Sequence, residues 1–220
     1  MTLFHPILII PAYNEVESIC AVVRSVIKYA PVLVVDDGST DLTGEEATSS
    51  GATVYVHSEN RGYEAALASG LTEARRLGFT HAITFDGDGQ HNSQAIPEFI
   101  RALERGIDLV MGRRDHYQRL SEKIFGIVSN QLWGVSDPLC GMKAYRLALL
   151  DRFGPFDSKH LVGTEFALRI VMNKVPFSEV GVETKPRRGY SRYGNPLVAE
   201  YKIFRALVIT LIQISGLKFR

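Results

Sequence analysis

Short apolar runs alternate with segments of helical period through the first half of the chain, and this alternation limits the fold more than any other feature. The apolar runs predict strands at residues 5–11, 32–36, 53–57, 82–85 and 107–111. The periodic segments between them predict helices at residues 15–29, 62–77 and 96–105. A strand, helix, strand succession requires right-handed parallel crossovers. We therefore expect an α/β fold with an open, mostly parallel, Rossmann-like sheet and helices on both faces.

The second half is less regular but continues in the same class. Its patterns predict helices at residues 119–133 and 164–173, a strand at residues 177–182 and a C-terminal helix from about Pro196. The chain has no internal repeat or linker composition. We expect one domain over residues 1–195, followed by an apolar and basic helix over residues 196–220 that is not a separate domain.

Charge is distributed unevenly along the chain. The net charge is +1, but from Lys185 onward eight basic residues face a single acid, Glu200, which leaves the rest of the chain at −6. A basic tail with interleaved apolar residues suits an anionic membrane surface or a phosphorylated ligand. No aromatic and basic motif accompanies it, so we expect no nucleic-acid partner.

The C-terminal helix is too apolar to stand free in water. One interpretation places it in a membrane interface with its basic residues toward the headgroups, namely Lys202, Arg205, Lys218 and Arg220. The other packs it on its own domain or on a second copy of the chain in a homodimer. The apolar run at residues 206–217 is shorter than the roughly 20 residues of a membrane span. With no signal-peptide pattern at the start, we expect a cytoplasmic protein, free or peripheral on the inner membrane face.

Two carboxylates follow the predicted strand at residues 82–85. Asp86 and Asp88 are separated by Gly87, and Gln90 adds a neutral oxygen. Oxygen ligands at this spacing suit Mg²⁺ or Mn²⁺, which usually complete their coordination with substrate phosphates. The alternative is a plain surface turn, because Asp and Gly are turn residues.

A second acidic motif follows the strand at residues 32–36. Asp41 is placed to cap the next helix, but capping does not need two acids at the strand end. We expect Asp37 to accept hydrogen bonds from a base or from ribose hydroxyls. The sequence contains neither the dinucleotide GxGxxG pattern nor a phosphate-binding GxxxxGK[ST] loop, which disfavours oxidoreductases and P-loop NTPases.

Five short motifs follow one another along the chain: PAYNE at 11–15, VDDGSTD at 35–41, NRGYEAAL at 60–67, DGDGQH at 86–91 and DPLCG at 137–141. Together they resemble the family 2 glycosyltransferases, which have the GT-A fold. The DGDGQH and DPLCG strings, with RGYSR at 188–192, resemble the polyprenol-phosphate (dolichol-phosphate) mannosyl and glucosyl transferases within that family. The similarity covers about residues 5–193.

The resemblance implies roles for individual residues on the donor side. Donor-binding positions match Pro11, Tyr13, Glu15, Asp37 and Asp86, and metal-binding positions match Asp86, Asp88 and Gln90. The family implies a single displacement with inversion at the sugar carbon, in which Mg²⁺ or Mn²⁺ stabilises the leaving diphosphate.

The nature of the acceptor decides what else is needed. A phosphate is already anionic and needs cations, whereas a hydroxyl needs a carboxylate base. Candidate phosphate ligands are Arg114, Arg119, Ser121, Arg188 and Arg192. The residues expected at the reaction itself are Asp88, Arg113, Asp137 and Glu165, of which Asp137 and Glu165 are the candidate bases. Asp137 could instead fix a turn before Pro138, and Glu165 could favour a helix dipole.

These observations predict an inverting glycosyltransferase that moves a sugar from GDP-mannose or a UDP-hexose to a polyprenyl phosphate. Two alternatives stay open. The same enzyme class could act on a saccharide hydroxyl in cell-surface glycan synthesis, or the chain could be a non-catalytic nucleotide-sugar binding protein.

Overall fold

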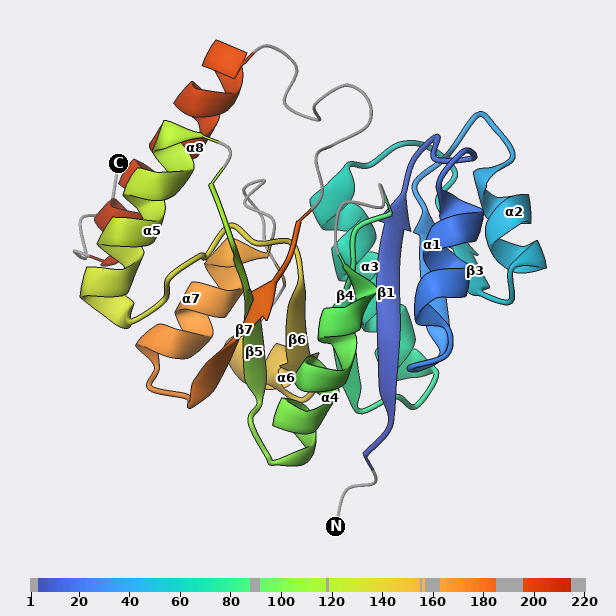
Figure 1. Cartoon of the computed structure of the whole chain (residues 1–220), viewed down its shortest axis with the longest axis horizontal. Helices are drawn as coiled ribbons and strands as arrows, with labels where there is room; N and C mark the ends of the chain where they lie inside the picture. The colour runs from blue at the N-terminus through green and yellow to red at the C-terminus, as the bar shows by residue number, and fades with distance from the viewer. Residues whose placement is uncertain are drawn as a thin grey trace.

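The computed structural model describes residues 4–87, 92–117, 119–154, 156, 163–184 and 196–214. Its centre is a seven-stranded sheet with the order β3-β2-β1-β4-β6-β5-β7 (Figure 1). The strands are β1 (Pro6–Ala12), β2 (Val32–Asp36), β3 (Thr53–Val56), β4 (His81–Thr84), β5 (Leu109–Arg114), β6 (Lys143–Arg146) and β7 (Phe177–Val182). Every pairing is parallel except those of β6, which runs antiparallel to β4 and β5.

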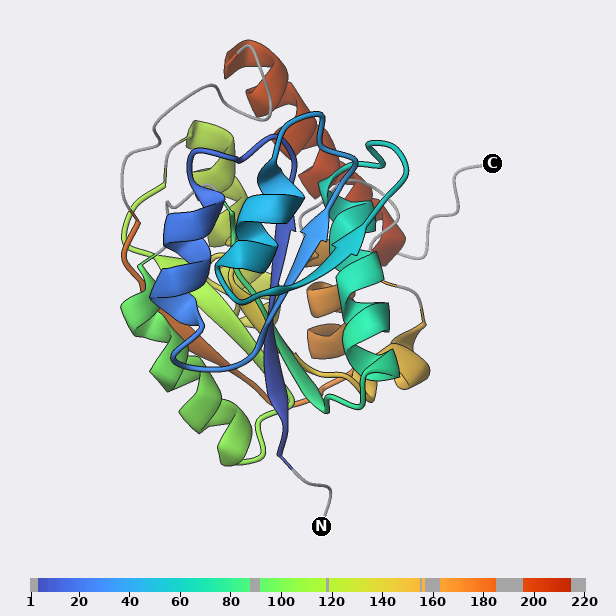
Figure 2. The same ribbon diagram turned by 90° about the vertical axis from the view of Figure 1, so that its right-hand side faces the viewer.

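Helices cover both faces of this sheet, as Figures 1 and 2 show. They are α1 (Ile19–Val26), α2 (Thr43–Ser49), α3 (Tyr63–Arg76), α4 (Ile96–Glu104), α5 (Leu120–Trp133), α6 (Leu149–Phe153), α7 (Thr164–Met172) and α8 (Pro196–Ile214), with a 3₁₀ turn η1 (Ser93–Ala95). Because successive strand residues point to opposite faces, Ile7 and Ile9 of β1 pack with α3, α5, α7 and α8. Leu8 and Ile10 pack with α1, α2 and α4 on the other face.

The α/β class and the mostly parallel sheet predicted from the sequence are confirmed. Two short elements, β6 and α6, were missed, and α2 was expected only as a helix after Asp41, without bounds. β6 carries a basic residue at each end and has only two strongly apolar positions, so its pattern is too weak to indicate a buried strand. Its partners on both sides hold it in the sheet.

Two boundaries also differ from the prediction. β5 continues to Arg114 instead of stopping at Met111, because its last two residues pair with Gly181 and Val182 of β7. α1 begins at Ile19 instead of residue 15, because the chain first turns through the hydrogen bond from the Ser18 amide to the Glu15 carbonyl. Asp41 lies one residue before the N-cap position of α2, which is Leu42 and has no side-chain cap hydrogen bond. The Asp41 carboxylate nevertheless accepts a 3.0 Å hydrogen bond from the amide of Thr43, the first residue of the helix.

The C-terminal helix α8 packs against α5 of its own domain. Ile203, Ala206 and Leu207 are buried in the same core as Phe125 of α5. At the beginning of α5, the Glu200 carboxylate accepts hydrogen bonds from the amides of Leu120 (3.3 Å) and Ser121 (2.9 Å). One face of α8 is therefore packed on its own domain, as the second interpretation of this helix expected. In the described part of the chain, no helix is both long and apolar enough to cross a membrane.

Gly126 in the middle of α5 offers a test of how this helix is seated. A Cβ at this position would lie 2.6 Å from the carbonyl oxygen of Ser136 and would press on the hydroxyl of Tyr117. Gly126→Ala should therefore lower the free energy of unfolding by about 1–3 kcal/mol, although Ala normally stabilises a helix relative to Gly. Urea unfolding measures this. The exposed Asn130→Ala on the same helix is the control and should gain slightly; a stabilised Gly126→Ala variant would refute this seating.

The contact between Glu200 and α5 predicts a pH dependence. Hydrogen bonding from Ser121, the amide of Leu120 and the charge of Arg119 hold the pKa of Glu200 below its ordinary value of 4.5. The lowered pKa means that this contact stabilises the fold above pH 4.5 and loses its effect as the pH falls through the folded-state pKa. Glu200→Gln should therefore lower Tm at pH 7, and the difference from the wild type should shrink as the pH falls from 4.5 toward 3.

The exposed Glu17→Gln is the matched control and should leave Tm unchanged at both pH values. A Glu200→Gln variant that melts with the wild type at pH 7 would show that the carboxylate does not stabilise the α5 terminus.

Candidate active site

A pocket of about 570 Å³ opens at the carboxyl ends of β1 and β2, where ligands bind in open α/β sheets. Four residues expected to bind the donor, Pro11, Tyr13, Glu15 and Asp37, all line it. The other walls come from the segment at the beginning of α3, from Leu139 and from α8; that segment contributes Asn60, Gly62, Tyr63, Glu64 and Ala66. The parallel register of β1 and β2, with Ala12 beside Asp36, brings the first two motifs together.

Asp37 is the most constrained residue of this pocket. Its Oδ1 lies 2.5 Å from Nδ1 of His57 and accepts a 3.0 Å hydrogen bond from the amide of Arg61. Its Oδ2 accepts a 2.8 Å hydrogen bond from the amide of Gly62, whose φ of +91° favours glycine. The Asp37 carboxylate therefore ties the end of β2 to the residue after β3 and to the start of α3.

The protonation of His57 follows from its two neighbours. A carboxylate can only accept, so Nδ1 of His57 carries the proton, and in the neutral ring Nε2 accepts from the Ser69 hydroxyl at 2.9 Å. Oδ1 of Asp37 then has both lone-pair directions engaged, whereas Oδ2 has one left. Asp37 can still accept one hydrogen bond from a ligand in the pocket.

Asp86 follows β4 and joins two of the sequence motifs. Its Oδ1 accepts a 2.5 Å hydrogen bond from the hydroxyl of Tyr63. A Cβ at Gly141 would lie 2.7 Å from its Oδ2, so the glycine of the DPLCG string leaves room for this carboxylate. Its side chain therefore lies between the beginning of α3 and residues 137–141.

The metal prediction rests partly on residues that are not described. Asp88 and Gln90 lie outside the described residues, and among those that are described no group of three or more His, Cys, Asp and Glu could hold an ion. The oxygen donor that is described, the nearly buried Asp86 carboxylate in the space left by Gly141, fits a hard divalent cation such as Mg²⁺ or Mn²⁺.

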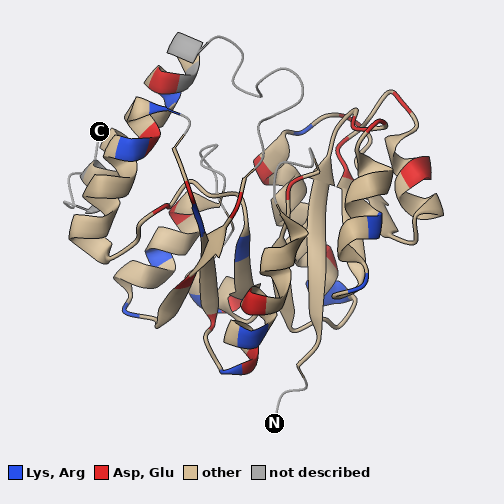
Figure 3. Cartoon of the chain, viewed as in Figure 1, with Lys and Arg blue, Asp and Glu red and all other residues tan. Residues whose placement is uncertain are grey.

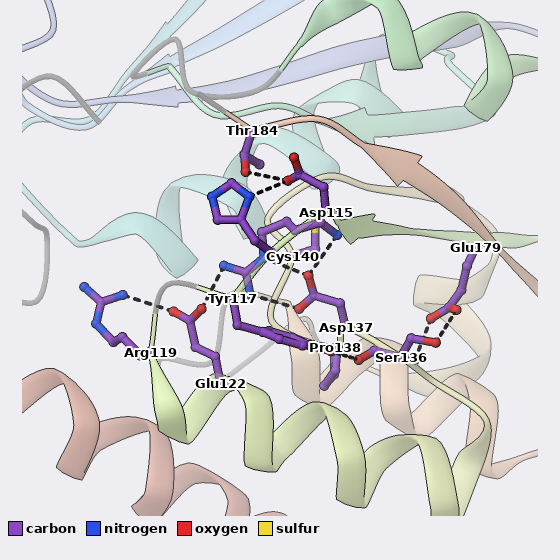
Figure 4. Close-up of polar contacts among 12 residues, drawn as sticks. Asp115, Tyr117, Arg119, Glu122, Ser136, Asp137, Pro138, Cys140, Glu179 and Thr184 are labelled. Carbon is purple, nitrogen blue, oxygen red and sulfur yellow. Dashed lines mark hydrogen bonds and ion pairs between the residues drawn. The ribbon is translucent and has the colours of Figure 1, made fainter. Parts of the chain in front are cut away.

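A second polar cluster lies between β5 and α5 (Figure 4). Arg114 donates from Nε to Oδ2 of Asp137 at 2.7 Å and from Nη2 to Oδ1 at 2.9 Å. Its Nη1 lies 3.2 Å from Oε2 of Glu122, and Arg119 donates to Oε1 of the same Glu122 at 3.0 Å. Burial disfavours the charged form of Arg114, but Asp137 and Glu122 more than offset this and raise its pKa. Arg114 is therefore a permanent cation paired with two carboxylates.

This cluster changes how two predicted site residues are interpreted. Asp137 is 1% exposed, and both of its oxygens accept from Arg114. This geometry favours a role for Asp137 in fixing Arg114 over a role as a general base. It likewise commits Arg114 to Asp137 and Glu122, which leaves it poorly placed to bind an acceptor phosphate.

The other predicted residues are more dispersed. Arg113 is exposed at the end of β5. Ser121 is buried at the start of α5, where its amide donates to Glu200. Glu165 is in the first turn of α7, and its Oε1 lies 3.5 Å from Nη2 of Arg169. Arg188 and Arg192 lie outside the described residues.

Sequence reasoning did not assign roles to three residues that the structure brings to this site. His57 supports Asp37, and Tyr63 donates to Asp86. Glu64 lines the pocket. Tyr63 and Glu64 belong to the NRGYEAAL string, which was recognised as a motif without individual roles. His57 has no sequence signal, because only the pairing of β2 with β3 brings it to Asp37.

Comparison with known proteins decides the family. Residues 7–153 match the family described as Glycosyl transferase family 2. The chain belongs to this family. A protein of Methanocaldococcus jannaschii described as uncharacterized is 27% identical over 93% of this chain and 91% of its own length. A polyprenol monophosphomannose synthase of Mycolicibacterium smegmatis is 29% identical over 88% of this chain and 83% of its own length.

Solved structures with low sequence identity to this chain have the same fold. Glucosyl-3-phosphoglycerate synthase of Mycobacterium tuberculosis, crystallised with Mn²⁺, UDP and phosphoglyceric acid, superposes with a TM-score of 0.79. The two proteins are 21% identical, and the match covers 98% of this chain and 80% of the other. The GT-A architecture expected for this glycosyltransferase is therefore confirmed.

The role of Asp137 in this glycosyltransferase can be tested through stability. Asp137→Ala leaves the buried guanidinium of Arg114 with Glu122 alone, so we expect the free energy of unfolding in urea to fall by about 3–5 kcal/mol. Asp151→Ala removes the partner of Arg75 in an exposed ion pair and should change it by less than about 0.5 kcal/mol. An Asp137→Ala variant of wild-type stability that has lost activity would instead support a catalytic base.

Proposed function

We propose that this family 2 glycosyltransferase moves a sugar, with inversion, from a nucleotide-sugar donor to a polyprenyl phosphate in a reaction that needs Mg²⁺ or Mn²⁺. The pocket that unites Pro11, Tyr13, Glu15 and Asp37 at the carboxyl edge of the sheet carries the donor part of this proposal. The acceptor part is supported by relatives named polyprenol monophosphomannose synthase and, over 48% of this chain and 46% of its own length, undecaprenyl-phosphate mannosyltransferase of Micrococcus luteus.

The nucleoside binds at the end of the pocket formed by Tyr13 and Asp37. Tyr13 is 44% exposed, so its ring is accessible to stack against a base. The remaining lone pair of Asp37 Oδ2 accepts an N–H of the base or a ribose hydroxyl, while His57 and two amides fix the carboxylate in place. GDP-mannose and a UDP-hexose are both compatible with one such acceptor.

The diphosphate lies toward Asp86, which with Asp88 and Gln90 would hold the metal. When bound, Mg²⁺ or Mn²⁺ acts as a Lewis acid that stabilises the leaving diphosphate. The Tyr63 hydroxyl orients the Asp86 carboxylate through its 2.5 Å hydrogen bond, and Gly141 leaves it space.

The acceptor phosphate needs cations more than a base. A phosphate monoester is already anionic near pH 7, so its oxygen attacks the sugar carbon without losing a proton to the protein. We assign Arg113, Arg119 and Ser121, with Arg188 and Arg192, to the acceptor side. Arg114 and Asp137 support this region as a buried ion pair. Because Asp137 is almost fully buried, it suits a reaction that uses no carboxylate base at this position.

A peripheral contact with the membrane would bring the lipid-linked acceptor to this site. Apolar side chains of α5 and α8 are exposed, including Leu120, Ile127, Tyr201 (67%) and Phe204 (52%). The two helices pack against each other at the edge of the molecule (Figures 1 and 2). We propose that these exposed side chains rest on the inner face of a membrane.

The direct test is a donor-turnover assay. GDP-mannose, UDP-glucose and UDP-N-acetylglucosamine are each offered with Mn²⁺, with and without a short polyprenyl phosphate, and release of nucleoside diphosphate is followed. We expect release from one donor that needs both the metal and the lipid phosphate. Asp88→Asn should lower turnover at least about 100-fold, the scale on which single electrostatic contributions to catalysis act.

Two results would contradict the proposal. Donor binding without lipid-stimulated release would exclude the polyprenyl-phosphate acceptor and favour a saccharide hydroxyl, with Glu165 as the next candidate base. Turnover that is unchanged in EDTA would exclude the metal requirement.

A further inference from the structure

The C-terminal helix α8 forms one wall of the donor pocket. Lys202, Ile203, Arg205, Ala206 and Ile209 all line it. Their spacing of three and four residues places them along one side of the helix. Lys202 and Arg205, which the sequence analysis turned toward lipid headgroups, both border the pocket.

The charges around the pocket make these two residues distinctive. The walls formed by the first half of the chain contribute three carboxylates, from Glu15, Asp37 and Glu64. Among the described residues that line the pocket, the basic ones are Lys202 and Arg205. Figure 3 shows acidic residues in the loops that follow β1 and β2, and both basic residues and the acidic Glu200 on α8. A diphosphate entering beside these acids needs positive charge to offset theirs.

Both side chains are available for a ligand. Lys202 and Arg205 are exposed, and neither makes a hydrogen bond or ion pair with another described residue. The helix that carries them is nevertheless held in place. Ile203, Ala206 and Leu207 are buried in the core, and Glu200 accepts from the amides at the start of α5. A ligand in the pocket therefore meets two cations on a fixed backbone.

We propose that Lys202 and Arg205 bind the phosphate groups of the donor nucleotide. This inference rests on the proposed donor site and adds to it a second phosphate-binding element, contributed by the C-terminal helix. Arg205 presents a planar guanidinium suited to two phosphate oxygens, and Lys202 presents a single mobile charge. The acceptor is also a phosphate, but the pocket that these residues share with Tyr13 and Asp37 assigns them to the donor.

The test compares nucleotides with nucleosides by isothermal titration calorimetry in Mn²⁺. UDP, GDP, uridine and guanosine are titrated into the wild type, Lys202→Ala, Arg205→Ala and the double variant. Each single substitution should weaken binding of the preferred diphosphate about tenfold, as expected for losing a hydrogen bond to a charged group. Binding of the corresponding nucleoside should not change, and Arg205→Lys should recover part of the loss.

Lys123→Ala is the matched control, because it removes an exposed positive charge from the neighbouring helix α5 outside the pocket lining. It should leave diphosphate binding at the wild-type level. Titration of a short polyprenyl phosphate provides a second arm, in which the Lys202 and Arg205 variants should bind like the wild type.

The outcomes separate this inference from the proposed function. If the wild type binds a diphosphate and the two variants bind it equally well, the inference is wrong and the donor site stands. Equal weakening of nucleoside and diphosphate would mean that the substitutions disturb α8, and it would overturn a phosphate-specific role. Weakened binding of the polyprenyl phosphate alone would reassign both residues to the acceptor. A wild type that binds neither UDP nor GDP would overturn the proposed donor site and the inference together.

Discussion

The buried carboxylate of Asp37 is the interaction on which the candidate site depends. The carboxylate accepts hydrogen bonds from the ring of His57 and from the amides of Arg61 and Gly62. These bonds hold the end of β2, the residue after β3 and the start of α3 together. Each of these donors would be costly to bury without an acceptor. The start of α3 in turn carries Tyr63, which reaches Asp86 beyond β4. One chain of hydrogen bonds thus connects the carboxyl ends of β2 and β4 around the pocket.

The opposite side of the site depends on buried charge. Arg114 forms ion pairs with Asp137 and Glu122, and Glu122 also forms an ion pair with Arg119. The end of β5, the DPLCG segment and the first turn of α5 therefore form one polar cluster. The Glu200 carboxylate of α8 accepts hydrogen bonds from two backbone amides in the same turn of α5. α8 therefore lies between the proposed donor side and the proposed acceptor side of the site. Its Glu200 contacts the side proposed for the acceptor, and its Lys202 and Arg205 border the side proposed for the donor.

The sequence predicted the strands whose formation depends on the apolar character of the strand itself. The apolar runs of β1, β2 and β4 are continuous because both of their faces are buried, so their strands and the parallel sheet could be predicted from the sequence. Their carboxyl ends share one edge, which is why Pro11, Tyr13, Glu15 and Asp37 could be placed together in advance. β6 could not be predicted, because four residues with a basic residue at each end become a strand only between β4 and β5.

The same limit applied to individual side chains. Asp137 in the sequence is an acid before a proline, and nothing local reveals that Arg114, 23 positions earlier, occupies both of its oxygens. The basic residues of α8 posed a similar difficulty, since a helix with apolar and basic residues suits a membrane surface or a phosphate pocket equally well. Only the packing of Ile203 and Ala206 on the core shows that Lys202 and Arg205 face the pocket.

A crystal structure with Mn²⁺ and the preferred nucleoside diphosphate tests the central claim most directly, namely that the pocket at the carboxyl edge of β1 and β2 is the donor site. The account predicts a base against Tyr13 with one hydrogen bond to Oδ2 of Asp37, and phosphates between Asp86 and the α8 wall. A nucleotide bound outside this pocket, with Asp37 and Tyr13 making no contact to it, would contradict the account.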